Sequence, residues 1–170
     1  MKNLKKLSLA LALSLGIGAT TAQAQTASAT INAQARILQA LVVNGAQTLD
    51  FGDVLLGSTK VLAAANASSG QFTVQGATNA EVDINFTFPG TLASGANTLA
   101  VGSWTGLEGI NTTRGASAGF NPNATFTRRL STTGTDVLNL YLGGSVTSAG
   151  AEPAGTYTGI IQMDVAYTGN

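Results

Sequence analysis

The stretch TYTGIIQMDVAY, residues 156–167, alternates between two kinds of side chain. Tyr157, Ile161, Met163, Val165 and Tyr167 fall on one side, and Thr, Gln and Asp dominate the other side. Successive side chains of a β-strand point to opposite faces, so this period predicts a half-buried strand. A Pro- and Gly-containing turn at residues 151–155 precedes it. A strand so near the end of the sequence raises the question of which strand pairs with its second edge.

The other end of the sequence predicts export. Three lysines precede an apolar run at residues 7–18, and Ala22-Gln23-Ala24 has the small-x-small pattern of a cleavage site. This is the pattern of a secretory signal peptide, and the run is too short to span a bilayer. We therefore expect residues 1–24 to be removed, which leaves a single domain at 25–170 with no membrane span. The predicted location is the periplasm or the surface of a bacterium, or the medium.

Composition excludes several classes of function. The segment 25–170 has five basic residues against eight acidic residues, so its net charge is −3 and it offers no basic stripe for nucleic acid. The chain has no Cys, which excludes disulfides and thiol chemistry. Charged residues make up 9% of the chain, against about a quarter in an average soluble domain. Such a neutral, hydroxyl-rich composition is more typical of structural and adhesive proteins than of cytosolic enzymes.

Strand patterns recur along the chain, and no helical period does. The clearest internal case is residues 81–88, where Val82, Ile84, Phe86 and Phe88 alternate with polar residues. Shorter patterns predict strands at 49–54, 71–75, 99–104, 125–130 and 137–142, and Asn44-Gly45 predicts a turn. Residues 58–69 fit either a helical turn or an edge strand. The fold class predicted is all-β: one antiparallel, immunoglobulin-like β-sandwich.

Two further segments carry predictions of their own. Residues 27–37 alternate small and polar side chains, and Ala29, Ile31, Ala33, Ala35 and Ile37 share one face, so a strand is expected there. Residues 105–123 contain four glycines, three asparagines and one proline, and we expect a long surface loop. Trp104 is expected to fill the core.

Catalytic and metal chemistry find few candidates. The absence of His and Cys excludes zinc-type metal sites, Ser-His-Asp triads and thiol nucleophiles. Glu81 and Asp83 share a strand face, but the opposite face is apolar, so they are interpreted as the wet side of the strand. Asp50 and Asp53 could approach a common cation, although no calcium-loop pattern surrounds them. Glu108 and Glu152 are interpreted as solvated loop charges. We expect no enzyme, no cofactor and no metal.

Two motifs resemble a family of secreted bacterial domains. Leu49-Asp50-Phe51-Gly52 looks like the family's "LDFG" element, and residues 153–159 with Val165-Ala166-Tyr167 are similar to its closing "aGtYtG…V-x-Y". The family is still described as a domain of unknown function, and its pattern is related to spore coat protein U and to chaperone–usher pilin subunits. The chain departs from the pilin pattern in lacking a cysteine pair and in placing Tyr167 fourth from the end.

The resemblance implies a surface subunit that assembles by strand complementation, in which an extended segment of one copy adds to a sheet edge of the next. The donor would be residues 25–37, with Ile31 and Ile37 as the largest plugs. The acceptor edge would involve the strand at 156–167. The implied partners are other copies of the chain or related surface subunits, together with a periplasmic chaperone and an usher.

Three functions remain open at this point. The first is a pilin-like structural or adhesive subunit with its donor strand in trans. The second is a self-complemented monomer, with the same segment in cis, that binds a ligand through the 105–123 loop. The third is a carbohydrate-active enzyme, which would need converging carboxylates and aromatic platforms that the sequence does not offer.

Overall fold

The computed structural model describes residues 26–111, 113–114, 117–131, 133 and 135–169. The chain divides into two units, Met1–Ala35 and Arg36–Asn170, and all of the strands lie in the second unit. The predicted signal peptide falls outside the described residues. Within those residues every strand pairing is antiparallel and no α-helix occurs. The all-β antiparallel sandwich predicted from the sequence is therefore confirmed.

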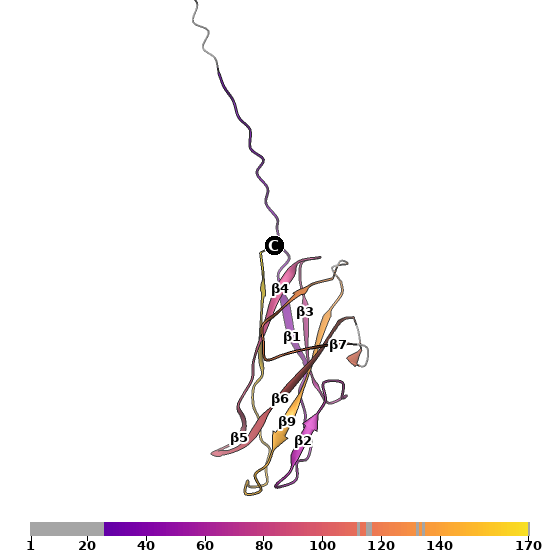
Figure 1. Ribbon diagram of the computed structural model, residues 1–170, viewed down its shortest axis with the longest axis vertical. Coiled ribbons are helices and arrows are strands. Elements are labelled where there is room, and N and C mark those ends of the chain that lie inside the picture. The colour runs from indigo at the N-terminus through magenta and orange to yellow at the C-terminus, as the bar shows by residue number, and fades with distance from the viewer. Residues whose placement is uncertain (1–25, 112, 115–116, 132, 134, 170) are drawn as a thin grey trace, which may run out of the picture. The chain divides into compact units, whose positions relative to one another are not determined.

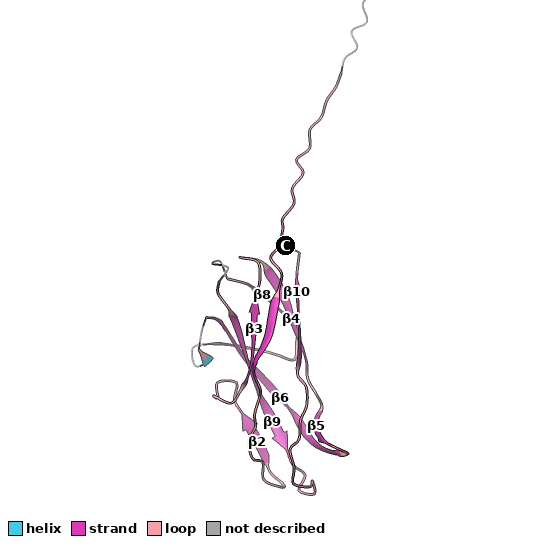
Figure 2. Cartoon of the chain, turned by 180° about the vertical axis from the view of Figure 1, so that it is seen from behind, coloured by secondary structure: helices cyan, strands magenta, loops and turns pink. Residues whose placement is uncertain are grey.

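The strands form two sheets (Figures 1 and 2). Sheet A has the order β1-β3-β9-β6-β5, with β2 on β9 and β7 on β6. Its strands are β1 (Val42–Gln47), β2 (Thr59–Leu62), β3 (Gly70–Gln75), β5 (Thr91–Ser94), β6 (Asn97–Ile110), β7 (Ala118–Phe120) and β9 (Leu138–Thr147). Sheet B has the order β10-β4-β8, formed by β10 (Gln162–Tyr167), β4 (Glu81–Thr87) and β8 (Phe126–Arg129).

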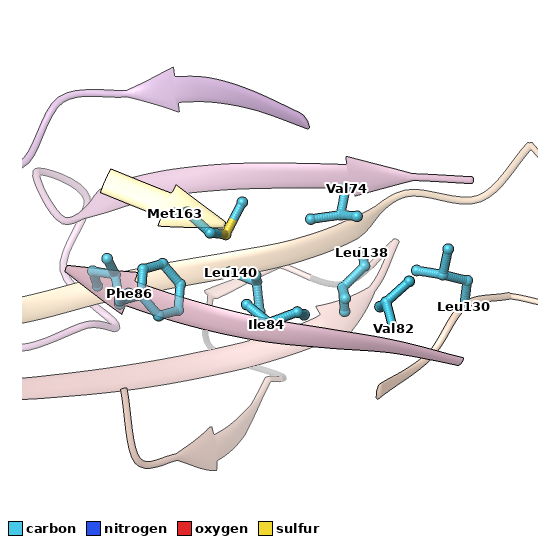
Figure 3. Close-up of a cluster of buried hydrophobic side chains, with 9 residues drawn as sticks. Val74, Val82, Ile84, Phe86, Leu130, Leu138, Leu140 and Met163 are labelled. Carbon is cyan, nitrogen blue, oxygen red and sulfur yellow. The ribbon is translucent and has the colours of Figure 1, made fainter. Parts of the chain in front are cut away.

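The main core lies between the two sheets. Val82, Ile84 and Phe86 of β4 face Leu138 and Leu140 of β9, and all are buried. Figure 3 shows Met163 of β10 among these residues. Fully burying each such side chain contributes about 1.5–3 kcal/mol relative to its exposed state. This layer fixes β10 as part of the sandwich, since the inward face of β10 is apolar and its outward face is wet.

A second, smaller cluster fills the other end of the sandwich. Phe51, Leu62, Leu99 and Val146 are buried there, and Tyr157 packs against them. Trp104 is half-buried and stacks on Phe88 at 4.4 Å between ring centroids. It is a member of neither core cluster, so it does not fill the core as predicted.

The structure corrects the strand predicted at residues 27–37. No strand forms between residues 26 and 41, and Ile31 and Ile37 are 93% and 96% exposed. A strand needs a partner for its main-chain N–H and C=O groups. The shared face of this segment is mostly alanine, which buries too little apolar surface to hold the segment on a sheet by itself.

Two predictions failed where a local motif was given the wrong role. Asn44-Gly45 was predicted to end a strand, but both residues lie inside β1, where the register shifts between Gly45 and Gln47. Residues 49–54 form no strand, because Gly52 has a φ of +62° and its N–H donates to Asp50 Oδ1 at 2.7 Å. Side-chain caps of this kind replace ladder hydrogen bonds.

The predicted loop at 105–123 is wrong at residues 105–110 and at residues 118–120. Residues 105–110 belong to β6, and residues 118–120 form β7, which pairs with β6. The glycines suggested a loop, but Gly106 serves packing: a Cβ there would lie 2.5 Å from the Phe120 ring. The segment left undecided at 58–69 contains the short strand β2.

The predicted final strand is correct in its second half only. β10 begins at Gln162, and before it Thr158 forms an isolated bridge with Ala93 of β5. Gly159 lies so close to Leu92 and Pro89 that a Cβ would clash with Leu92 at 2.8 Å. The chain thus passes from the edge of sheet A to the edge of sheet B, and one continuous ladder is impossible. Among the described residues no helix is long and apolar enough to cross a membrane.

Candidate functional site

β10 is an edge strand. It pairs with β4 from Gln162↔Thr87 to Tyr167↔Val82, and no described strand pairs with its other side. Met163 is buried, and Ile161, Val165 and Tyr167 are half-buried against the main core. These four of the five predicted acceptor residues come together, whereas Tyr157 packs in the second cluster. The edge predicted from the sequence is therefore present, but it is shorter than predicted.

The main chain of this edge has a defined direction. Thr168 N–H donates to Glu81 O at 3.1 Å, which makes that position a hydrogen-bonded pair. Because such pairs alternate along an antiparallel ladder, the N–H and C=O groups of Met163, Val165 and Tyr167 point away from β4. An outward row of donors and acceptors is a template for a further strand.

The Tyr167 hydroxyl fastens the start of the sandwich to the end of β10. It donates to Gln39 O at 2.6 Å and accepts from Ala77 N–H at 2.6 Å. The contact depends on Gly76, since a Cβ there would lie 2.5 Å from the hydroxyl and 2.8 Å from Leu41 Cδ2. We call the Tyr167 hydroxyl, the Gln39 carbonyl and the Ala77 N–H the Tyr167 latch. It holds the chain at Gln39 beside the final strand, so that a donor would come from residues 26–38, within which Arg36 donates to Thr78 O at 3.3 Å.

β1 is a second edge with incomplete cover. Its inward position Val43 pairs with buried Val74, yet Val43 remains 38% exposed. The next inward position, Gly45, has no side chain and lies opposite half-buried Phe72. Val42 on the other face is 46% exposed. The apolar face of β1 is thus less covered than that of the inner strands.

The opposite side of the sandwich, at β8 and β6, is closed by an ion pair. Arg128 of β8 binds Glu108 of β6, and Glu108 is only 6% exposed. The hydrogen bond that Arg128 donates to Glu108 raises the pKa of Arg128, and burial offsets part of this rise. Phe120 and Phe126 pack beside it with ring centroids 4.5 Å apart. The interpretation of Glu108 as a solvated loop charge is wrong, because it lies in β6 and faces inward.

The sequence did contain a signal for this pair. Phe126, Arg128 and Leu130 share the inward face of a predicted strand, so a charge there demands a partner. What the sequence could not supply was the identity of the partner, which comes from a different strand within a Gly-rich stretch.

The remaining acidic candidates have structural partners. Glu81 pairs with Arg129 at 2.5 Å, and Asp83 accepts from Thr127 Oγ1 at 2.6 Å. Both lie on the outer face of sheet B, so the wet-face interpretation is confirmed. Asp50 caps Gly52, and the main-chain carbonyl of Asp53 accepts from Lys60 Nζ at 2.9 Å. No group of three or more His, Cys, Asp or Glu side chains suited to a metal occurs within the described part of the chain.

Glu152 is a loop residue with an organised environment. Its carboxylate accepts from the N–H groups of Ala149 and Gly150 at 2.7 and 2.9 Å, and from Ser148 Oγ at 2.8 Å. The hydrogen bonds from Ala149 and Ser148 lower the pKa of Glu152 to about 2. The carboxylate thus organises the turn that leads toward β10.

Comparison with protein-family models finds no match for this chain. A search of the curated proteins likewise finds no significant match. The resemblance to pilin-like domains therefore rests on the two short motifs, and the function must be argued from the geometry.

Proposed function

We propose that the protein is a secreted structural or adhesive subunit, pilin-like in its assembly. The exposed segment 26–38 of one copy would add as a strand to the outer edge of β10 in another copy. The observation that carries this proposal is the coincidence of two features among the described residues: an extended segment with no ladder partner, and an edge strand, β10, that pairs with β4 on one side only.

The chemistry of the two features is complementary. The alternating face of the segment carries Ile31 and Ile37, which are almost fully exposed. The edge that would receive them has half-buried Ile161 and Val165. Strand addition gives affinity through main-chain hydrogen bonds and specificity through alternate side chains. Burying two isoleucine side chains would contribute about 3–6 kcal/mol before the ordering cost of the segment.

Charge does not oppose this pairing. Residues 26–35 contain no charged side chain, and on β10 the sole charge is Asp164, on the outward face. Arg36, the one charged residue of the segment 26–38, is a cation, whereas Asp164 is an anion, so no like-charge repulsion arises at this edge. The Tyr167 latch would also limit a donor in cis, since it holds Gln39 beside the last residue of the acceptor strand.

The test is the assembly state of the protein exported to a periplasm, on unboiled and boiled denaturing gels. A ladder that collapses on boiling is expected. The double variant Ile31→Asp, Ile37→Asp should abolish the ladder. The matched control Asn32→Asp, Gln34→Asp adds the same charge to the opposite face and should retain the ladder.

Two outcomes would contradict the proposal. One is a monomer band for the unmodified protein together with a deletion of residues 26–37 that no longer folds, which would mean that the segment completes its own domain in cis. The other is a ladder that persists in the isoleucine double variant, which would place the assembly contact elsewhere.

A further inference from the structure

The outer face of sheet A contains a hollow of about 730 Å³. Thr73 of β3 and Asn139 of β9 are register partners on its floor, next to Tyr141. Because Leu138 and Leu140 point into the core, Asn139 and Tyr141 point outward into this face. Asn111, Thr113 and Arg114 complete the wall from the segment after β6. We call it the Arg114 hollow.

Arg114 is held in place by neutral groups. Its Nε donates to Ser69 Oγ at 2.9 Å and its Nη2 to Gln47 Oε1 at 2.6 Å. Its guanidinium lies 4.7 Å from the centre of the Tyr141 ring, and Tyr141 is only 4% exposed. The cation is thus fixed by hydrogen bonds and by cation–π contact before any ligand arrives.

The charge of this arginine is not balanced by the protein. Arg128 and Arg129 each pair with a glutamate, whereas no carboxylate of the described residues lies within ion-pair distance of Arg114. Its Nη1 has no hydrogen-bond partner among those residues either. A planar guanidinium with free donors is suited to a carboxylate. Asp136, which binds the lining residue Asn111, also accepts from Ser131.

The other groups of the hollow suit hydroxyls rather than a second charge. The hydroxyls of Thr73 and Thr113 have no hydrogen-bond partner among the described residues. Asn111 is oriented, because its Oδ1 accepts from Val137 N–H at 2.9 Å while its Nδ2 donates to Asp136. One fixed cation ringed by neutral donors and acceptors is a site for a hydroxyl-rich ligand with a single carboxylate.

We propose that the Arg114 hollow binds a carboxylated sugar of the uronic or sialic acid class, through an Arg114–carboxylate pair and hydroxyl contacts to Thr73 and Thr113. The volume lies within the usual range of small-ligand sites, about 300–1,000 Å³. This inference is independent of strand complementation, because the hollow lies on the outer face of sheet A and involves neither β10 nor the segment 26–38.

The test is a titration of the uniformly ¹⁵N-labelled protein, followed by NMR. N-acetylneuraminate and glucuronate are the ligands, and glucose and acetate are the controls at equal millimolar concentrations. We expect at least one acid sugar to shift the Arg114 Nε–H and Asn139 side-chain signals, with weaker or no shifts from glucose and acetate. Comparison of the two acid sugars shows whether the hollow accepts a sialic acid, a uronic acid or both.

Variants make the assignment specific. Arg114→Gln should weaken binding at least tenfold, while the matched control Arg36→Gln, an exposed arginine outside the hollow, should leave it unchanged. Arg114 also binds Ser69 and Gln47, so its replacement could disturb the fold. Thr73→Val therefore serves as a second variant: it leaves the hydrogen bonds of Arg114 in place and should weaken binding severalfold. The proposal is overturned if neither acid sugar binds, if acetate or glucose binds as well, or if both Arg114→Gln and Thr73→Val bind normally.

Discussion

At the scale of single residues, the structure depends on polar groups that join distant parts of the chain. The Tyr167 hydroxyl joins Gln39 to Ala77, and Glu108 joins the two sheets through Arg128. The alternating pattern predicted that Tyr167 faces inward, but it could not predict the latch, because both of its partners are main-chain groups. Such contacts are invisible to side-chain periodicity and follow only from the three-dimensional path of the chain.

The latch gives a direct prediction. Tyr167→Phe removes one donor and one acceptor and leaves the N–H of buried Ala77 without a partner, which should cost about 1–3 kcal/mol of unfolding free energy. The control is Tyr157→Phe, whose hydroxyl donates to exposed Pro153 O, and it should cost less than about 1 kcal/mol. Urea denaturation of both variants measures the difference. Equal losses would mean that the latch does not stabilise the domain.

The inter-sheet ion pair gives a second prediction at this scale. Arg128→Ala leaves Glu108 buried and unpaired, so the loss should be about 3 kcal/mol, near the lower limit for a buried pair, because the Arg128 side chain is 42% exposed. The neighbouring Arg129→Ala breaks the more exposed pair with Glu81 and should cost about 0.2–1 kcal/mol. Denaturation midpoints compare the two variants. A larger loss for Arg129→Ala would contradict the assigned burial.

At the scale of elements, alternation succeeds wherever a strand has one buried face and a partner. It located β4, β9 and the second half of the final strand, because the core imposes their period. It failed for residues 27–37, where the same period exists without a partner strand. The glycines at residues 105–110 wrongly indicated a loop, because Gly106 packs against the Phe120 ring and Gly109 lies within the long strand β6. Hence the alternating pattern alone cannot distinguish a paired strand from an extended segment that has no partner strand.

The outward main chain of β10 can be tested with proline. Val165→Pro removes an N–H that points away from β4, so the domain should stay folded while strand addition is impaired. Asp164→Pro removes an N–H directed at β4 and should destabilise the sheet, because a ladder hydrogen bond is lost. Circular dichroism reports the fold, and unboiled gels report assembly. A Val165→Pro protein that folds and still forms a ladder would exclude this edge as the acceptor.

The turn organised by Glu152 predicts a dependence on pH. Its pKa in the folded protein is lowered to about 2, below the ordinary value of 4.5. The stabilisation by its carboxylate is therefore complete above about pH 4.5 and is lost as the pH falls from there through about 2. The amide signals of Ala149 and Gly150 should titrate in this window by NMR and should not do so in Glu152→Gln. A midpoint near 4.5 in the unmodified protein would contradict the hydrogen bonds described.

At the scale of the whole molecule, the sandwich is closed unevenly. The β6–β8 side has aromatic contacts and an inter-sheet ion pair, whereas β10 and β1 are edges with half-buried apolar side chains. No residue of the segment 26–37 belongs to either core cluster. A protein of this design should fold alone yet gain stability whenever another strand is supplied.

This gain can be measured with a synthetic peptide. A truncated protein lacking residues 26–37 should fold, because none of the removed side chains belongs to either core cluster. Adding a peptide of residues 26–37 at a hundredfold excess over its Kd should stabilise the protein by about 2.7 kcal/mol, which raises Tm on the order of 10 °C. A peptide with Ile31→Asp and Ile37→Asp should have no effect, because charged side chains cannot enter an apolar core. If both peptides act equally, the plugs are not the source of affinity; if neither acts, the sandwich does not accept this strand.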